Sequence, residues 1–296
     1  MTDALRFAVI GSPVAHSKSP AMHAAAYRAL GMPHVYEKLE TSDAELASRV
    51  DALRRGDWAG LNVTVPHKQR VLSLVDEVDA SARIVGAANT LVRCGGKVVA
   101  HNTDAAALVE ELAALAPDRA RLARRTGVVV GAGGASRAAI AAMGVLGIRR
   151  VIVLGRGLDD AERALAIQIE GERILAATAS SPTALATTNI VPRALASGLA
   201  PTRDVVALVQ ATSCGMTGAA PGEIVADALD WSRAPPDAIA LDVVYAPRDT
   251  PFLARARARG LAHANGLGML ARQGALAFRL WLGVDPPLDA MLAAIA

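Results

Sequence analysis

Short apolar runs and amphipathic stretches alternate through the first hundred residues. Three runs have the length and pattern of strands, and they lie at 6–11, 34–40 and 60–65. The amphipathic stretch from Asp43 to Arg55, which is followed by a glycine, predicts a helix between the second and third runs. Further on, two apolar segments flank Gly95-Gly96, which is typical of a β-hairpin. This pattern predicts an α/β unit.

Two further helices are predicted from their starts. Ser19 followed by Pro20 offers a capping hydroxyl and a proline in the first turn. Pro66 is expected to begin another helix that runs to Val85, with Lys68 in its first turn. A cation at a helix amino end is electrostatically unfavourable, so the position of Lys68 hints at a purpose other than helix stability.

The middle third predicts a βαβ unit. A glycine-interrupted apolar run at 127–134 precedes a helical stretch, a second strand-like run at 149–155 and a second helix over 159–169. Two more strand-like runs, at 205–212 and 238–245, extend the prediction towards a parallel sheet. The pattern over 171–201 predicts no element, and after Thr250 it is helical to residue 296.

Composition narrows the class of protein. The 296 residues are 52% apolar, and 31 Lys and Arg nearly balance 28 Asp and Glu, which excludes a disordered chain. The arginines are scattered and only 3% of residues are aromatic, so nucleic-acid binding is not expected. No secretory signal is visible, and the longest uncharged apolar stretch, 138–148, is far shorter than the roughly 20 residues of a membrane span. Cys94 and Cys214 form no disulfide framework and no metal spacing, so a cytoplasmic protein without a metal is expected.

A glycine-rich turn is the first candidate site. Gly131, Ala132, Gly133, Gly134 and Ala135 follow a predicted strand and open a predicted helix, where free backbone amides can approach a pyrophosphate.

The residue about 20 positions after this turn indicates which dinucleotide the turn would bind. An acid at that distance would bind an adenosine ribose, but Arg156 stands there, which favours the 2′-phosphate of NADP. Asp159 and Asp160 keep NAD open, although both also suit the cap of the next helix.

Polar side chains gather at three other places in the first half. Ser17 and Ser19 flank a lysine in the loop after the first strand, where hydroxyls can hold a polar ligand. Asn62 and Thr64 are two residues apart and so share one face of a strand. Asn89 and Asp104 lie at predicted element edges. Capping or solvation would account for each of these alone.

The motifs HSKSP, GLNVTVPHK, GAANTL, HNTD, GAGGAS, ATSCGM, DVVYAPRDTPFL and GLGMLARQGALAF occur in this order across almost the whole chain. In combination they resemble the shikimate dehydrogenase family. The resemblance implies an α/β substrate-binding domain at 1–104, a Rossmann NADP-binding domain at 105–265, and helices at 266–296 that return to the first domain. It also implies reversible NADPH-dependent reduction of 3-dehydroshikimate to shikimate, in the synthesis of aromatic amino acids.

The resemblance also implies roles for individual residues. Lys68 and Asp104 match the family's catalytic pair. The positions that match substrate contacts are Ser17, Ser19, Asn62, Thr64, Asn89, Tyr245 and Gln273. The positions that match cofactor contacts are Gly131, Ala132, Gly133, Gly134, Ala135, Arg156, Thr212 and Gly266.

The chain departs from the family pattern near the cofactor. Gly155 and Gly157 flank Arg156 where the family commonly has asparagine and threonine, and Gln210 replaces another asparagine. Two alternatives therefore stay open: a quinate or shikimate dehydrogenase that uses NAD, and a non-catalytic shikimate-binding regulator. The presence of both Lys68 and Asp104 argues against the regulator. A monomer or a homodimer is expected, acting on a small molecule.

Overall fold

The computed structural model describes residues 4–116, 118–178, 188–196 and 198–296. The chain forms two compact units. The first unit consists of Met1–Ala107 together with Met269–Ala296, and the second consists of Leu108–Gly268. Each unit is built on a sheet of six strands. The first unit is therefore discontinuous in sequence, whereas the second is one continuous stretch.

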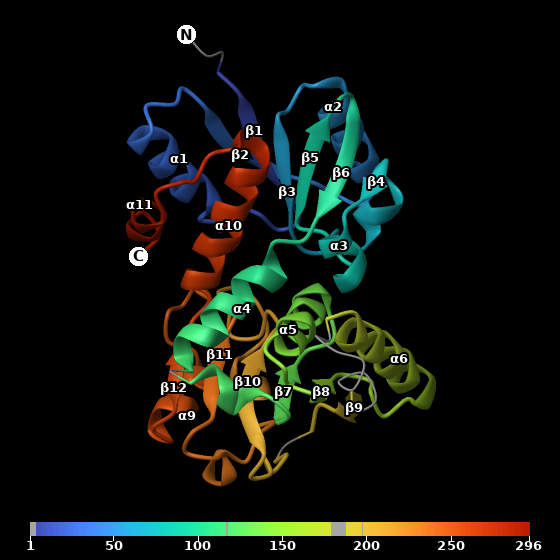
Figure 1. The fold of residues 1–296 in the computed structure, drawn as a ribbon, viewed down its shortest axis with the longest axis vertical. Helices are drawn as coiled ribbons and strands as arrows, with labels where there is room; N and C mark the ends of the chain where they lie inside the picture. The colour runs from blue at the N-terminus through green and yellow to red at the C-terminus, as the bar shows by residue number, and fades with distance from the viewer. Residues whose placement is uncertain (1–3, 117, 179–187, 197) are drawn as a thin grey trace. The chain divides into compact units, whose positions relative to one another are not determined.

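The sheet of the first unit has the strand order β2-β1-β3-β5-β6-β4 (Figure 1). Its strands are β1 (Arg6–Gly11), β2 (Val35–Glu40), β3 (Gly60–Val63), β4 (Glu77–Val78), β5 (Thr90–Cys94) and β6 (Lys97–His101). Strand β1 pairs in parallel with β2 and β3, whereas β5 runs antiparallel to β3 and β6. The predicted hairpin is confirmed, and both of its turn glycines have positive φ, +57° at Gly95 and +84° at Gly96.

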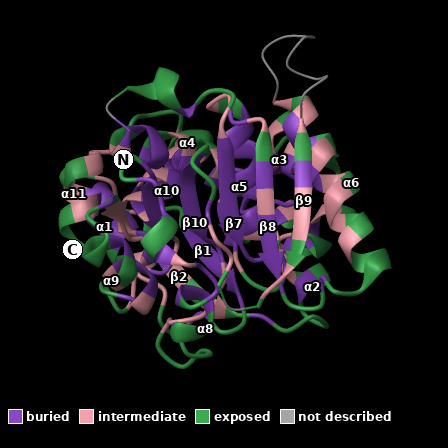
Figure 2. Cartoon of the chain, turned by 90° about the horizontal axis from the view of Figure 1, so that it is seen from below, coloured by how far each residue is buried: buried purple, intermediate pink, exposed green. Residues whose placement is uncertain are grey.

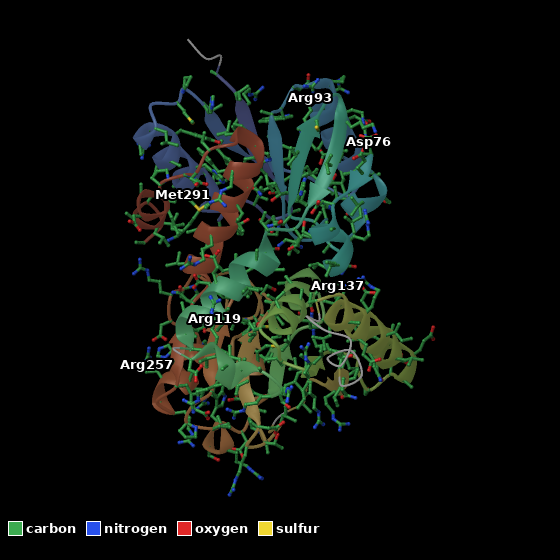
Figure 3. The ribbon with its side chains drawn as sticks, viewed as in Figure 1. Asp76, Arg93, Arg119, Arg137, Arg257 and Met291 are labelled. Atoms are coloured by element: carbon green, nitrogen blue, oxygen red, sulfur yellow. The ribbon has the colours of Figure 1, made fainter. Side chains whose placement is uncertain are left out.

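The helices of the first unit are α1 (Ser19–Ala29), α2 (Leu46–Arg55), α3 (Ala80–Val85), the 3₁₀ helix Arg70–Ser73, and α11 (Leu288–Ala293), with most of α10 (Leu267–Leu282). Helix α1 packs on β2 and on α11. On α11, Met291 is fully buried (Figure 3). Two aromatic rings stack in the core, those of Phe7 in β1 and Trp281 in α10, with 5.0 Å between centroids.

Two predictions for this unit are wrong. Ser19 does not cap α1, because the cap position is Lys18 and no side chain bonds there. No continuous α-helix runs from Pro66 to Val85: residues 65–69 form turns, Glu77–Val78 form β4, and of the predicted stretch only Ala80–Val85 is α-helical. The amide of Ala88 donates to the carbonyl of Lys68 at 2.7 Å. That tertiary hydrogen bond holds the Lys68 backbone beside the residues that precede β5, outside any helix.

The sheet of the second unit is fully parallel, with the order β12-β11-β10-β7-β8-β9. Its strands are β7 (Thr126–Val130), β8 (Arg150–Gly155), β9 (Asn189–Ala194), β10 (Val205–Gln210), β11 (Ile239–Asp242) and β12 (Ala262–Ala264). The central strands β7 and β10 are buried throughout, as Figure 2 shows in purple. This strand order is that of the nucleotide-binding Rossmann fold. All strands are parallel, but the chain adds strands towards one edge of the sheet from β7 and towards the other edge from β10, so the topological switch point lies between these two strands.

The helices of the second unit are α5 (Gly134–Val145), α6 (Ala161–Ala177), α8 (Glu223–Ala226), α9 (Pro251–Ala258), two 3₁₀ helices at Arg119–Leu122 and Trp231–Arg233, and most of α4 (Asp104–Leu115). Helix α5 packs against β7 and α6, and α9 packs against β11 and β12. Helix α6 runs past the predicted end at 169. It does so through Gly171, where a Cβ would lie 2.8 Å from Cγ1 of Ile190 on β9.

Two strands of this sheet were not predicted. Strand β9 lies in the stretch that predicted no element, and β12 lies where a continuous helix was predicted. Both are edge strands and neither is mostly buried, so neither has the apolar run that identifies a central strand. No helix in the described ranges is long and apolar enough to cross a membrane.

Candidate active site

Lys68 and Asp104 form an ion pair in the first unit. Nζ of Lys68 donates to Oδ2 of Asp104 at 2.7 Å. Lys68 stands in the turn after β3, and Asp104 is the first residue of α4. The side chains are 17% and 5% exposed, respectively, so the carboxylate is withdrawn from water while the ammonium keeps an open side. A cation in this position is free to face a ligand.

Asn89 holds the other oxygen of Asp104. Its Nδ2 donates to Oδ1 of Asp104 at 2.9 Å and to Oγ1 of Thr103 at 2.8 Å, and it lies 3.2 Å from Oε1 of Gln273. The amide of Thr103 donates in turn to Oδ1 of Asn89 at 2.7 Å. A carboxamide has two hydrogens for these three acceptors, so one acceptor must share a hydrogen or turn to another donor.

Gln273 comes to this cluster from α10. Its Nε2 donates to the carbonyl of Leu270 at 2.8 Å, which turns Oε1 towards Asn89. Gln273 is 9% exposed, and 184 residues separate it from Asn89 in the chain. Three segments of the first unit therefore bring Lys68, Asn89 with Asp104, and Gln273 together.

Asn62 bonds to the backbone of Asn89 and to the neighbouring Thr90, and so helps to hold the cluster in place. Its Nδ2 donates to the carbonyl of Asn89 at 3.0 Å and to Oγ1 of Thr90 at 3.1 Å, while its Oδ1 accepts from the hydroxyl of Tyr36 at 2.7 Å. Asn62 is 5% exposed, so its carboxamide is already used within the protein. Tyr36 is part of this network, although no sequence pattern singles it out, because it lies in an ordinary alternating strand.

The two serines lie at the start of α1. Oγ of Ser17 accepts from the amide of Ser19 at 3.3 Å, and Ser19 is 6% exposed. A hydrogen bond with Ser19 opposes the rise that burial causes in the pKa of Tyr36, so polar contacts run from Ser19 through Tyr36 to Asn62. Lys18 between the serines is occupied elsewhere, because its Nζ donates to the carbonyl of Ile295 at 2.6 Å.

Thr64 is half-buried at the end of β3. Its Cγ2 would lie 2.4 Å from a Cβ at Gly11, so the last residue of β1 approaches this side chain closely. Thr64 lies two residues after Asn62, the spacing from which a shared strand face was predicted. Asn62 is buried, however, whereas Thr64 is half-buried.

The glycine-rich turn of the second unit joins β7 to α5 and fits a pyrophosphate. A Cβ at Gly131, where φ is +123°, would lie 2.8 Å from Oγ of Ser136 and 2.9 Å from Cγ2 of Thr212. Gly133, at the cap position of α5, has no atom within 4 Å of its Cβ direction. The first turn of the helix carries no acid that would repel an anion from its amino end. Gly134 and Ala135 continue the turn into α5, and Ala132 is half-buried.

The loop after β8 would meet the adenosine ribose in a fold of this order. Arg156 is exposed there, directly after the last strand residue, Gly155. Oδ1 of Asp160 accepts from the amide of Arg163 at 2.8 Å, so this acid caps α6. The alternative assignment of Asp160 as a helix cap is therefore confirmed.

Thr212 follows β10, on the other side of the topological switch. The buried side chain of Gln210 accepts from the Thr212 amide and donates to the carbonyl of Cys214 at 3.1 Å. Nε2 of Gln210 also lies 3.2 Å from Oδ1 of Asp242, at the end of β11. The longer side chain in place of the family's asparagine thus ties two strand ends together.

Asp242 is fully buried, and no sequence pattern marks it as a candidate site residue. Oδ1 accepts from the amide of Val244 at 2.9 Å, and Oδ2 accepts from Oγ1 of Thr250 at 2.5 Å. Desolvation nevertheless raises the pKa of Asp242 to about 6. The carboxyl anchors both ends of the loop 243–250, which carries the half-buried Tyr245.

Gly266 is buried just before α10. Its amide donates to the carbonyl of Val244 at 3.1 Å, and a Cβ there would lie 2.1 Å from the carbonyl oxygen of Val243. Only a glycine allows this approach of the two backbones. Tyr245, Gly266, Thr212 and the glycine-rich turn all belong to the second unit, whereas the other predicted substrate contacts and the Lys68–Asp104 pair belong to the first.

The described residues contain no group of three or more His, Cys, Asp or Glu placed to hold a metal ion. Cys94 and Cys214 are free thiols.

A parallel sheet with the Rossmann order, a glycine cradle at its switch point and a polar Lys–Asp cluster in a separate α/β unit define the class of two-domain dinucleotide-dependent oxidoreductases. Two family models match the chain: the shikimate dehydrogenase substrate binding domain over residues 9–91, and the shikimate 5′-dehydrogenase C-terminal domain over residues 266–296. The shikimate dehydrogenase (NADP(+)) of Rhodospirillum rubrum is 39% identical over 97% of this chain and 94% of its own length. The chain belongs to the shikimate dehydrogenase family.

Solved structures agree with this membership. Shikimate 5-dehydrogenase from Thermus thermophilus, in complex with NADP(H) and shikimate, is 37% identical, with a TM-score of 0.77 over 98% of both chains. Quinate dehydrogenase from Corynebacterium glutamicum, in complex with NAD, is 32% identical, with a TM-score of 0.80 over 99% of both chains. Relatives of similar likeness thus differ in substrate and in cofactor.

Proposed function

We propose that the protein is a cytoplasmic shikimate dehydrogenase that reversibly reduces 3-dehydroshikimate to shikimate with NADPH. The observation that carries the proposal is the Lys68–Asp104 pair, held by Asn89 within the first unit. Relatives across 97% of the chain that bear this activity in their names support it.

Lys68 has the chemistry that ketone reduction needs. The hydride would come from NADPH held at the glycine-rich turn 131–135, and its addition to the carbonyl carbon would leave negative charge on the carbonyl oxygen. The Lys68 ammonium stabilises that charge and donates a proton to the oxygen, and solvent then reprotonates the amine. An arginine could not do this equally well, because a guanidinium hardly releases its proton.

Asp104 and Asn89 position the lysine. The carboxylate of Asp104 pairs with the ammonium of Lys68 in a partly buried site and fixes the direction of Nζ. In the oxidation direction, the same carboxylate is placed to accept a hydrogen bond from a substrate hydroxyl. Ser17, Ser19, Thr64 and Gln273 supply further hydrogen-bonding groups of the first unit for the carboxylate and hydroxyls of the substrate.

The second candidate is a quinate or shikimate dehydrogenase that uses NAD. Gly155 and Gly157 leave the loop beside Arg156 without polar side chains for a 2′-phosphate, and the Corynebacterium glutamicum relative is a quinate dehydrogenase in complex with NAD. This candidate shares the Lys68–Asp104 chemistry and differs in the ring of its substrate, which is saturated in quinate, and in the cofactor.

Initial rates with shikimate and with quinate, each with NADP and with NAD, test both candidates. We expect the highest kcat/KM for shikimate with NADP. A preference for quinate and NAD would establish the second candidate. Binding of shikimate without reduction of either cofactor would instead identify a non-catalytic regulator, and the molecular mass in solution would distinguish a monomer from a homodimer.

A further inference from the structure

We propose that Lys18 is a positioning residue: its hydrogen bond to the carboxyl end of α11 sets the direction of Ser17 and Ser19 for the substrate carboxylate. This inference rests on the proposed function, in which both serines serve the substrate. Lys18 stands between them in the sequence. Its backbone occupies the cap position of α1, so a change in that backbone moves both neighbouring side chains.

The first argument is the bond itself. Nζ of Lys18 donates to the carbonyl of Ile295 at 2.6 Å, although 277 positions separate the two residues in the chain. Ile295 follows the last residue of α11, Ala293, and carbonyls at the carboxyl end of a helix lack amide partners within the helix. A lysine ammonium is a suitable donor for such carbonyls. Ile295 is 2% exposed, so the lysine is tied to a firmly packed residue.

The second argument is the charge of Lys18. An ammonium group at the amino end of α1 is unfavourable for that helix, because the helix dipole is positive there, but it is favourable at the carboxyl end of α11, where the dipole is negative. The bond to Ile295 therefore directs the charge of Lys18 to the helix end that it stabilises. The first turn of α1 carries no acid that would repel a carboxylate from the amino end of the helix, beside Ser17 and Ser19.

The third argument is the way in which the loop before α1 is held. Its first half is fixed by β2, because Nζ of Lys38 donates to the carbonyl of Ala15 at 2.5 Å and the amide of Val14 donates to Oε2 of Glu40 at 3.1 Å. Lys18 lies three residues beyond Ala15, and its side chain fixes the second half to α11, on which α1 also packs (Figure 1). The part of the loop that carries the serines is therefore set from α11.

Kinetics with shikimate and with its methyl ester test the assignment. Lys18→Met keeps an unbranched apolar stem but cannot donate. We expect it to raise KM for shikimate about ten-fold, as the loss of one hydrogen bond from a charged donor predicts, and to leave kcat within about two-fold. KM for the ester, which has no carboxylate for the serines to bind, should change by less than about two-fold. Lys18→Arg can still donate to the carbonyl and should recover part of the loss.

A second variant tests the same bond from its other side. Deleting Ile295 and Ala296 removes the acceptor and should also raise KM for shikimate, and adding Lys18→Met to the deletion should raise it by less than a further two-fold or about that. Lys97→Met is the matched control, because Lys97 is an exposed lysine of the same unit that pairs with Glu77, and it should change neither KM. Melting temperatures establish that each variant is folded.

Three results would each overturn the assignment: an unchanged KM for shikimate in folded Lys18→Met protein, an equal rise for shikimate and its ester, or additive effects of Lys18→Met and the deletion. Calorimetric titration with shikimate separates this question from the proposed reaction. Wild-type protein that binds shikimate without oxidising it would refute the reaction, and the affinities of the variants for shikimate and its ester would then decide the role of Lys18. Wild-type protein that binds neither shikimate nor quinate would overturn both proposals.

Discussion

Both oxygens of the Asp104 carboxylate are occupied by groups that the chain places far apart: Nζ of Lys68 lies 2.7 Å from Oδ2, and Nδ2 of Asn89 lies 2.9 Å from Oδ1. The carboxylate is thereby fixed in rotation, and it fixes the ammonium in turn. A proton donor with one defined direction is what stabilises charge on a ketone oxygen without reorganisation in the transition state.

Replacing Lys68 by alanine should lower kcat by about 10²- to 10⁴-fold, because the proton donor is lost. The variant should stay folded, as judged by its circular dichroism and melting temperature. Lys97→Ala is the control, because Lys97 also pairs with an acid, Glu77, at 2.7 Å, but on the surface. Near-normal turnover by folded Lys68→Ala protein would refute the role of this lysine.

Asn89→Asp should lower kcat/KM at pH 7 by about 10²-fold. The change removes the donor to Oδ1 of Asp104 and sets a second carboxylate against it, which disturbs both the charge and the direction of the pair. At lower pH a protonated carboxyl at this position can donate again, so the ratio of variant to wild-type kcat/KM should rise as the pH falls from 7 towards 5. A ratio that does not change with pH would contradict this account.

Two glycines of the same turn should respond differently to alanine. Gly133 has open space in its Cβ direction and φ of −100°, so Gly133→Ala should fold normally but weaken dinucleotide binding by roughly ten-fold or more, since a methyl group would occupy the pyrophosphate cradle. Gly131→Ala should lower stability by about 1–3 kcal/mol, because of its positive φ and a close contact with Ser136. Thermal melts and cofactor titrations separate the two effects, and similar results for both variants would count against the cradle.

Asp242 should make the protein less stable as the pH rises through its folded pKa. Burial raises that pKa from 3.8 to about 6, so between these values the folded state keeps a proton that the unfolded state releases. The contribution of protonated Asp242 to the free energy of unfolding is complete below pH 3.8 and lost above about pH 6, and it amounts to about 3 kcal/mol.

Asp242→Asn should abolish this part of the pH dependence, because an amide can keep the contacts to Val244 and Thr250 without titrating. Urea unfolding at pH 4.5 and pH 7.5 measures the difference. Asp249→Asn is the control, since Asp249 is exposed and its pairing with Arg257 lowers its pKa, the opposite direction. Parallel profiles for wild type and Asp242→Asn would contradict the assignment.

His23 should make the protein sensitive to acid. Neither ring nitrogen of this fully buried side chain has a hydrogen-bond partner among the described residues, and the ring stacks on Tyr36 at 4.3 Å. Burial lowers the pKa of His23 from 6.5 to about 3, so below pH 6.5 the unfolded state takes up a proton that the folded state does not. Stability is therefore lost as the pH falls through this window, by about 2 kcal/mol at pH 5.

His23→Phe retains the stacked ring and removes both unpartnered nitrogens. We expect it to raise the melting temperature at pH 5 more than at pH 8, in differential scanning fluorimetry. An equal shift at both pH values would mean that the histidine acts only through packing.

Local sequence signals predicted the elements that local forces decide. Strand β1 has the predicted bounds, Gly56 ends α2 in the left-handed conformation, and the turn at Gly95 joins the predicted hairpin. The glycine-rich turn also stands between a strand and a helix, as its spacing indicates. In each case the deciding interaction is a backbone conformation or a burial pattern within a few residues.

Elements decided by distant contacts were not predicted. Strand β9 is half-exposed and gains its pairing from β8, so its own residues carry no clear strand pattern. Residues 65–69 carry helix-start signals, but the hydrogen bond from Ala88 to Lys68 holds them as turns. The motif resemblance named the members of the polar cluster. The contact between Asn89 and Gln273, and the support from Tyr36, became visible only in the folded chain.

The discontinuous first unit constrains the order in which the two units can fold during translation. Lys18 in the loop before α1 bonds to the carbonyl of Ile295, and α1 packs on α11, so this unit needs residues from both sides of the second (Figure 1). A ribosome moving at roughly 10 residues per second needs on the order of a quarter of a minute to translate the intervening stretch. During that time α1 lacks its partner helix, while the Rossmann unit can fold as it emerges. The first unit therefore completes its fold only after its last helices have been translated.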